Sequence, residues 1–295
     1  MKPNNAALDF KGITLLVLLC ASWGFNQVAI KVILQDISPI LQAGIRSMGA
    51  TLLVLVWMTL RHIPVLSKDK TLWWGITVGL LFSAEFILIY WGLNFTNASR
   101  AVIFLNTSPF VVALGSQLFI PGGTLSKVQL SGLCLAFIGI IVAFNESLNL
   151  PTRETLLGDV MLMGAAVFWG ATTVVIKTGP LAFIAPSKTL LYQIGVSAMV
   201  LPAASLALGE PGITNLSPLV IGSLFYQIVW IAFITYIVWF WLISNYAVSK
   251  LASFTFLTPF FGVIAGAIFL NEQITLSLVC ALVLVGTGIY LVNRR

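Results

Sequence analysis

The stretch WGFNQVAIK at Trp23–Lys31 has a near copy later in the chain, WGATTVVIK at Trp169–Lys177. Tryptophan, glycine, valine, isoleucine and lysine recur at matching positions, 146 residues apart. A second match joins Ser99–Pro109 with Ser249–Pro259, at an offset of 150 residues. Such self-similarity indicates an internal repeat. We therefore predict two related halves, residues 1–145 and 155–295, which together form one transmembrane domain.

The composition decides what kind of structure these halves contain. Of the 295 residues, 59% are hydrophobic and 8% are charged, and the mean hydropathy is +1.03. Soluble proteins carry roughly 25% charged residues, so this chain could not cover a water-exposed surface. An ordinary soluble enzyme and a disordered chain are therefore excluded. The net charge of +6 comes from scattered basic residues that form no basic patch, so we expect no nucleic-acid partner.

Apolar stretches of about 20 residues predict membrane-spanning helices. The chain contains ten, near residues 12–33, 39–60, 72–93, 99–119, 127–144, 157–177, 187–208, 218–243, 251–270 and 274–292. Each half thus holds five helices, and an odd number forces the second copy to enter the membrane inverted. We predict an all-α polytopic membrane protein with ten transmembrane helices arranged as two inverted five-helix repeats. Such repeats are common in secondary transporters, although a duplication with a purely structural outcome is the alternative.

The basic residues predict the orientation through the positive-inside rule. With the amino terminus inside, eleven of the fifteen basic residues fall on the cytoplasmic side: Lys2, Lys11, Arg61, Lys68, Lys70, Lys127, Lys177, Lys188, Lys250, Arg294 and Arg295. The outer side keeps Lys31, Arg100 and Arg153 and the acidic Asp36, Glu146, Glu154, Glu210 and Glu272. We expect a multi-pass protein of the inner (plasma) membrane with both termini in the cytoplasm.

Cysteine and histidine usage argues against metal chemistry. Cys20, Cys134 and Cys280 lie in apolar stretches without CxxC spacing, which predicts neither a disulfide framework nor a zinc site. We expect them to be buried packing residues. A single histidine, His62, provides no metal cluster. We therefore expect no metal and no cofactor.

Several motifs resemble the two EamA-type repeats of the drug/metabolite transporter superfamily. They are the paired Trp-Gly…Ile-Lys segments, Ser38-Pro39…Arg46, Asn97–Ala101…Pro109, Val248–Ser253…Thr258-Pro259, Phe269–Glu272 and Gly286–Gly288. The resemblance implies ten helices, cytoplasmic termini, a central cavity and export or exchange of small metabolites, among which amino acids are frequent. The chain departs from the family pattern where Pro121-Gly122-Gly123 replaces the acidic residue that Glu272 supplies in the second half.

Glu85 and Arg46 are the charges that the sequence places well inside spans. Glu85 lies ~12 Å from the end of its helix and Arg46 ~10 Å from the start of its own, at the helical rise of 1.5 Å per residue. The two charges therefore lie at similar depth on the outer side. Two interpretations compete: a structural ion pair, with Arg46 also able to extend toward the outer face, or a cavity-facing Glu85 that binds an amino group or carries a proton.

Polar and aromatic side chains at helical spacing complete the candidate substrate-binding site. Amides and hydroxyls facing lipid would be unsatisfied, so they indicate a cavity, although helix–helix hydrogen bonds or an interfacial aromatic belt are the alternatives. The candidates are Trp23, Asn26, Gln27, Glu85, Asn106, Trp169, Thr173, Tyr226, Gln227, Trp230 and Thr258. This lining suits an amphipathic organic molecule with a polar head.

We therefore predict a secondary transporter of small organic metabolites that works by alternating access, with the helices at 72–93, 99–119, 218–243 and 251–270 moving around the cavity. Export of amino acids or related compounds is the favoured activity, and we expect no enzyme. The alternatives are a membrane-embedded enzyme and a non-transporting scaffold. The expected partners are a small-molecule substrate and the lipid bilayer, and the sequence does not decide between a monomer and an oligomer.

Overall fold

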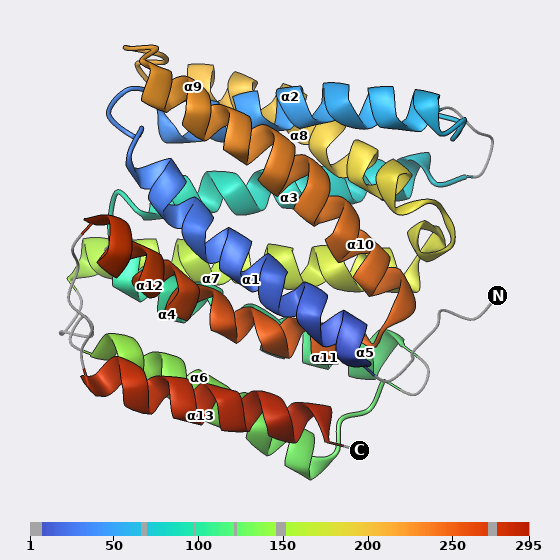
Figure 1. The fold of residues 1–295 in the computed structure, drawn as a ribbon, viewed down its shortest axis with the longest axis vertical. Coiled ribbons are helices and arrows are strands. Elements are labelled where there is room, and N and C mark those ends of the chain that lie inside the picture. The colour runs from blue at the N-terminus through green and yellow to red at the C-terminus, as the bar shows by residue number, and fades with distance from the viewer. Residues whose placement is uncertain are drawn as a thin grey trace.

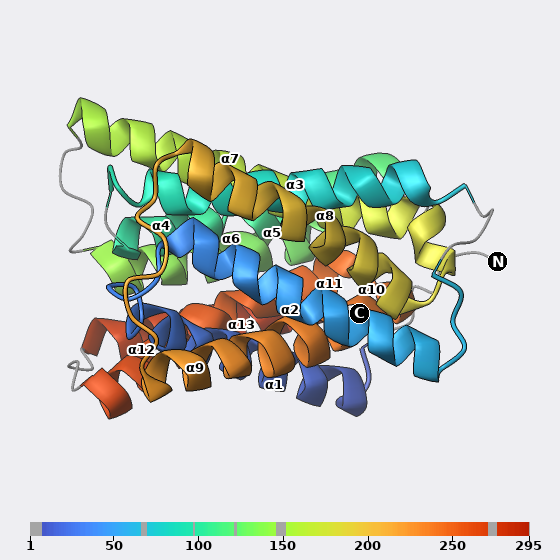
Figure 2. The same ribbon diagram turned by 90° about the horizontal axis from the view of Figure 1, so that it is seen from above.

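The computed structural model describes residues 8–65, 70–96, 98–120, 123–145, 152–270 and 276–294. Within these residues every long element is a helix, and the sole bridge of extended backbone joins Ile37 to Ile213. The long helices lie side by side and run roughly along one direction in two perpendicular views (Figures 1 and 2). The all-α fold class is confirmed. Lys2, Lys68, Glu146, Glu272 and Arg295 lie outside the described residues.

In the described part of the chain, ten helical segments are long and apolar enough to cross a membrane, as predicted. Seven are unbroken: α1 (Phe10–Lys31), α2 (Pro39–Leu60), α3 (Leu72–Gly92), α6 (Lys127–Phe144), α7 (Arg153–Thr178), α8 (Pro186–Ala207) and α13 (Leu276–Asn293). The other three are interrupted: α4 (Ala98–Leu105) with α5 (Ser108–Phe119), α9 (Pro218–Phe225) with η3 (Tyr226–Thr235) and α10 (Tyr236–Asn245), and α11 (Val248–Phe254) with η4 (Thr255–Leu257) and α12 (Thr258–Leu270).

The spans predicted near 99–119 and 251–270 are present, and each is interrupted just before a proline. Between α4 and α5, the side chains of Asn106 and Thr107 donate to the carbonyl oxygens of Val102 and Phe104 at 2.7 and 2.6 Å. Pro109 follows at the second residue of α5, where a residue without an N–H is tolerated. Pro259 holds the equivalent position in α12. The backbone is therefore irregular near the middle of both spans.

The segment η3 is a π-helix of ten residues within the eighth span. Such segments are rare, and they occur frequently at functional sites. This one contains three residues of the predicted site, Tyr226, Gln227 and Trp230.

The two ends of the described chain lie at one end of the bundle, here called the terminal end. The Tyr246 hydroxyl donates to Asp9 Oδ1 at 2.7 Å, which joins the turn after α10 to the start of α1. Lys250 Nζ donates to the Asn293 carbonyl oxygen at 3.5 Å, which joins α11 to the end of α13. Lys177 is buried there and donates to the carbonyl oxygens of Ile243 and Tyr246. The opposite end is called the far end.

Glycines allow two of the closest helix contacts. The helices α6 and α13 lie against each other along one edge of the bundle (Figure 1). A Cβ atom on Gly132 of α6 would meet the carbonyl oxygen of Gly288 at 2.7 Å, so a side chain there would push the two helices apart. Gly75 of α3 lies against the ring of Tyr192, and it thereby packs α3 onto α8.

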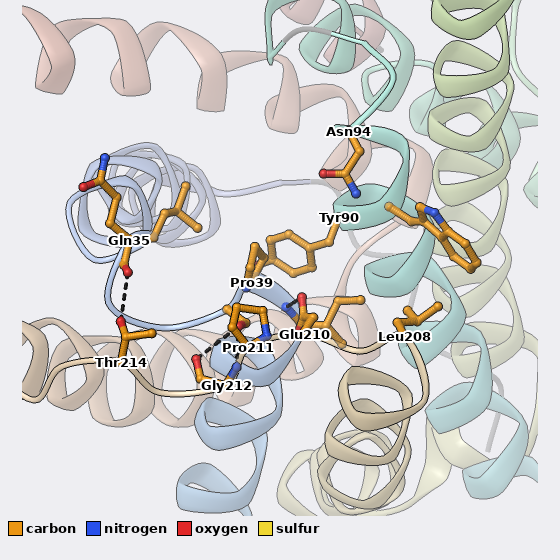
Figure 3. A pocket seen from close by; sticks show the side chains of 13 residues that line it. Gln35, Pro39, Tyr90, Asn94, Leu208, Glu210, Pro211, Gly212 and Thr214 are labelled. Carbon is orange, nitrogen blue, oxygen red and sulfur yellow. Dashed lines mark hydrogen bonds between the residues drawn. The ribbon is translucent and has the colours of Figure 1, made fainter.

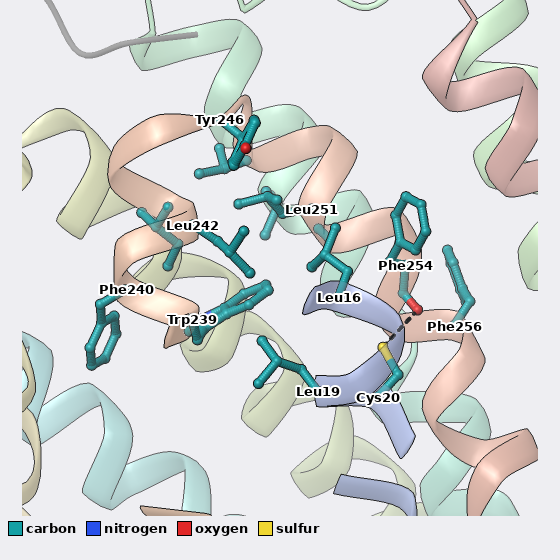
Figure 4. Close-up of a cluster of buried hydrophobic side chains, with 14 of the residues drawn as sticks. Leu16, Leu19, Cys20, Trp239, Phe240, Leu242, Tyr246, Leu251, Phe254 and Phe256 are labelled. Carbon is teal, nitrogen blue, oxygen red and sulfur yellow. Dashed lines mark hydrogen bonds between the residues drawn. The ribbon is translucent and has the colours of Figure 1, made fainter. Parts of the chain in front are cut away.

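Part of the buried core lies where α1, α10 and α11 meet (Figure 4). Cys20 is buried in it, and its thiol donates to the carbonyl oxygen of Phe254 at 3.2 Å. The other two cysteines, Cys134 and Cys280, are exposed on α6 and α13, so their prediction as buried residues is wrong. Both lie on the helix pair α6 and α13, which turns an apolar face outward. Leu60 of α2 is likewise an exposed apolar side chain, with 72% of its surface accessible, and such side chains are suited to contact with lipid.

Candidate functional site

Arg46 and Glu85 are both buried, on facing parts of α2 and α3. The guanidinium carbon of Arg46 lies 4.6 Å from the centre of the Phe86 ring, in a cation–π contact. Both charged side chains belong to the described residues, and no direct ion pair joins them, although Glu85 lies within electrostatic reach of Arg46. Arg46 Nε and Nη2 have no hydrogen-bond partner. Arg46 and Glu85 therefore do not form the direct ion pair that the sequence allows.

Aromatic rings surround the two charges. Phe82, Phe86 and Tyr90 follow one another along one face of α3, with ring centres 4.7 and 6.0 Å apart. Tyr236 of α10 contacts Phe82 edge-on at 6.2 Å. Tyr90 and Tyr236 both lie within electrostatic reach of Arg46. The charges thus lie in a shell of low polarity with two hydroxyl groups.

A cavity of about 340 Å³ opens at the far end of the bundle (Figure 3). Its lining comes from the start of α2, the end of α3 and the loop after α8, and it includes Tyr90, Asn94 and Glu210. Tyr90 thus connects the cavity to the aromatic shell around Arg46. The volume is sufficient for a small metabolite.

Two loops close over the start of α2 beside this cavity. The loop between α1 and α2 is joined to the loop between α8 and α9 by hydrogen bonds of Ser38 with Gly212, and Thr214 Oγ1 donates to the Gln35 carbonyl oxygen at 3.0 Å (Figure 3). The Glu210 carboxylate accepts the backbone N–H groups of Ile40 and Leu41, both at 3.0 Å. These N–H groups lack partners within the helix, so the carboxylate caps α2.

A second cavity, of about 380 Å³, lies at the terminal end. It is lined mainly by apolar and aromatic side chains, among them Trp57 and Trp241, and by Lys11, whose Nζ lies 4.9 Å from the centre of the Trp241 ring. Ile237 of α10 also lines it, directly after Tyr236 of the aromatic shell. The two charges lie between these cavities along the bundle, although neither Arg46 nor Glu85 lines either of them.

Three aromatic residues of the predicted site meet where α1 contacts the π-helix. Tyr226 donates to the Ser22 carbonyl oxygen at 3.1 Å, and Trp230 Nε1 donates to the Ser22 hydroxyl at 2.9 Å. Trp23 Nε1 donates to Thr235 Oγ1 at 3.0 Å. The structure thus brings Trp23, Tyr226 and Trp230 together as an interlocked contact between the first and eighth spans.

The remaining predicted residues are dispersed. Asn26 is buried with an unpartnered Oδ1, whereas its neighbour Gln27 is exposed. Gln227 is buried and donates to Ser223 Oγ at 3.1 Å. Four candidates lie on α7 and near the interrupted spans. Asn106 donates to the Val102 carbonyl oxygen of α4, and Thr173 donates to the carbonyl oxygen of Trp169, which is half-buried on α7. Thr258 Oγ1 is buried without a hydrogen-bond partner.

Sequence reasoning missed two features of the polar interior. Gln42 is fully buried one turn before Arg46, and its spacing of four residues was the signal that could have revealed it. Arg100, which the sequence places on the outer side, is buried and forms an ion pair with Asp159 of α7. Asp159 lies near the start of an apolar run, so it could have been noticed as a third intramembrane charge.

Ten helices in the described residues that are long and apolar enough to span a membrane, with charges in their interior, define a multi-pass membrane protein. The sequence model of the EamA-like transporter family matches residues 10–145 and again residues 156–294. The chain therefore belongs to this family, and it is a membrane transporter.

Relatives support this assignment along nearly the whole chain. The uncharacterized transporter YvbV of Bacillus subtilis is 31% identical, over 95% of this chain and 91% of its own length. A probable amino-acid metabolite efflux pump of Escherichia coli is 28% identical, over 94% of this chain and 93% of its own. A solved crystal structure superposes with a TM-score of 0.80 over 96% of both chains at 15% identity, which shows the shared fold.

Proposed function

We propose that this transporter exports small organic metabolites, amino acids or related amphipathic compounds, by alternating access. The observation that carries the proposal is the buried Arg46, unpaired beside Glu85, between the far-end and terminal-end cavities. Charged groups inside a membrane domain are costly and mark substrate or ion pathways. The name of the Escherichia coli relative supports efflux and amino-acid chemistry.

Alternating access requires that the two cavities reach the charges in turn. The loops that join Ser38 to Gly212 border the far-end cavity, and their separation would widen access to the charges from that side. The interrupted spans and the π-helix are the segments that we expect to bend. Glu85 is the group that we propose as the proton carrier if transport is coupled to protons.

We further propose an inner-membrane location with both termini in the cytoplasm. The support is the positive-inside rule, since Lys11, Arg61 and Lys250 lie at the terminal end. The proposal calls for a substrate and the bilayer as partners, with no cofactor and no catalysis, and it is compatible with a monomer or an oligomer. A carboxy-terminal green fluorescent protein fusion should fluoresce, whereas an alkaline phosphatase fusion at the same point should be inactive; the reverse would overturn the orientation.

Counterflow in proteoliposomes tests the transport function. Vesicles with the purified protein are loaded with the twenty standard amino acids, and radiolabelled amino acids are offered outside. We expect saturable accumulation of at least one amino acid above that in protein-free vesicles. The same assay with amines and sugars covers other small metabolites. Uptake equal to the protein-free control for every compound would overturn the proposed function.

A further inference from the structure

One face of α2 concentrates unpartnered buried polar atoms. Among the described residues, nine buried side-chain nitrogen or oxygen atoms lack a hydrogen-bond partner, and four of them belong to Gln42 and Arg46. Gln42 is 0% exposed and Arg46 is 2% exposed. Residues four apart lie on the same face of a helix. Since leaving buried donors and acceptors unpaired is unfavourable, this face is arranged for a group that the chain itself does not supply.

A second arginine in the same molecule shows which group fits. Arg100 holds Asp159 through Nε, at 3.0 Å from Oδ1, and through Nη2, which donates to Oδ2. These two nitrogens form one edge of the guanidinium plane, which matches the two oxygens of a carboxylate. In Arg46, Nε and Nη2 are the atoms without partners. The ring of Phe86 meanwhile contacts the guanidinium and holds its orientation.

The surroundings of Arg46 favour a substrate that carries both charges. Glu85, next to Phe86, lies within electrostatic reach of Arg46 but is not bonded to it, so its carboxylate can receive a positive group. Tyr90 joins this region to the far-end cavity, which provides a route between the charges and that side of the membrane. A free anion would satisfy Arg46 alone, whereas a zwitterion would satisfy both charges.

We propose that Arg46 and Gln42 form a binding subsite for the carboxylate of the substrate, with Glu85 positioned for its ammonium group. The inference rests on the proposed transport function and deepens it. The transported compounds are zwitterionic amino acids with a free carboxylate, and the carboxylate occupies the Nε–Nη2 edge of Arg46. Gln42 contributes its amide N–H one turn away on the same face.

The test compares an amino acid with its amide, which lacks the carboxylate but keeps the amino group and the side chain. The amino acid with the largest counterflow is used, together with its amide. We expect the wild-type protein to prefer the amino acid by about 10- to 100-fold in kcat/KM, which is typical of hydrogen bonds to a charged group. Arg46→Gln should remove this preference by weakening transport of the amino acid and sparing that of the amide. Gln42→Leu, a milder change of similar volume, should reduce the preference severalfold.

Arg61→Gln is the matched control. Arg61 is exposed at the end of α2 and stacks on Trp57 at 4.6 Å, so the same substitution there should keep the wild-type preference. If Arg46→Gln fails to fold, the subsite is still tested by the Gln42→Leu variant and by the comparison of the amino acid with its amide in the wild type. Equal kcat/KM for amino acid and amide in the wild type, or an intact preference in Arg46→Gln or Gln42→Leu, would overturn the subsite while transport stands. Absence of wild-type transport would instead overturn the proposed function.

Discussion

Two buried arginines, Arg100 and Arg46, differ in whether the chain supplies hydrogen-bond acceptors for their guanidinium groups. Arg100 is 6% exposed, and Asp159 satisfies its Nε–Nη2 edge. Thr96 Oγ1 also donates to Asp159 Oδ1 at 3.0 Å, which fixes the carboxylate. Arg46 is 2% exposed, and the same edge is empty. One guanidinium is completed by the chain, and the other is left incomplete.

The comparison teaches how to separate structural charges from functional ones. A buried ion pair with further hydrogen bonds joins two helices, here α4 and α7, and its removal should be measured as lost stability. A buried charge without a partner is unfavourable for stability, so its retention indicates a role in binding or transport. The two sites therefore predict opposite responses to matched substitutions.

The largest effect on stability is expected from Asp159→Asn. The substitution leaves Arg100 buried without a counter-charge, and breaking one side of a buried pair costs about 3–5 kcal/mol. The melting temperature of the purified protein in detergent should fall sharply. The double variant Arg100→Met/Asp159→Leu should recover much of the loss, because it removes both charges. A wild-type melting temperature for Asp159→Asn would contradict a structural role.

Glu85→Gln is the matched carboxylate-to-amide change at the other site. We expect it to reduce kcat/KM for amino acids by about 10-fold or more, as for a lost hydrogen bond to a charged group. Its melting temperature should change less than that of Asp159→Asn, since Glu85 forms no direct pair with Arg46. Full transport with an unchanged pH dependence would show that Glu85 has no functional role.

A smaller effect is expected from Glu210→Ala, which disturbs the start of the helix that carries Arg46. The carboxylate accepts two backbone N–H groups of α2 and the Ser205 hydroxyl. Loss of such a cap costs about 0.5–2 kcal/mol, so the melting temperature should fall moderately. Glu154→Ala, at an exposed acid in the first turn of α7, is the control. Equal shifts for both variants would contradict the cap.

The smallest effect is expected from Tyr246→Phe, which removes a hydrogen bond to the exposed carboxylate of Asp9. The backbone N–H of Gly12 and the Tyr246 hydroxyl hold the pKa of Asp9 below its usual value. A lowered folded-state pKa stabilises the protein above the usual aspartate pKa of about 4, and this contribution disappears as the pH falls through the folded-state pKa. The variant should melt slightly below the wild type at pH 7, and the gap should narrow in acid. A gap that widens in acid would contradict this contact.

Much of the fold could be predicted from the sequence. Ten spans were expected and ten are present in the described residues, because apolar runs of sufficient length are visible locally. The inversion of the two halves stays a prediction, although α2 and α8 are both 22 residues long and both begin with proline. The sequence shows Pro109 and Pro259 within two spans, but it does not show that the helix is interrupted just before them, at Asn106 and at Thr255–Leu257.

The candidate site was predictable only in part. Arg46 and Glu85 stood out because charges are rare in these spans, and Trp23, Tyr226 and Trp230 do meet across two helices. Gln27 is predicted in the site together with Asn26, but a helix turns neighbouring residues to different sides, and the structure leaves Gln27 exposed. The partner of Arg100 lies 59 residues away, beyond the reach of spacing arguments.

The sequence by itself determined that this protein has ten apolar runs long enough to cross a membrane, with a few charges inside them. The free energy of placing a helix in lipid is close to a sum over its own residues, so each span can be predicted from its own stretch of sequence. Only the tertiary structure decided which of those charges has a partner. Arg100 finds Asp159, whereas the same edge of Arg46 stays empty, because hydrogen bonds depend on how distant helices pack.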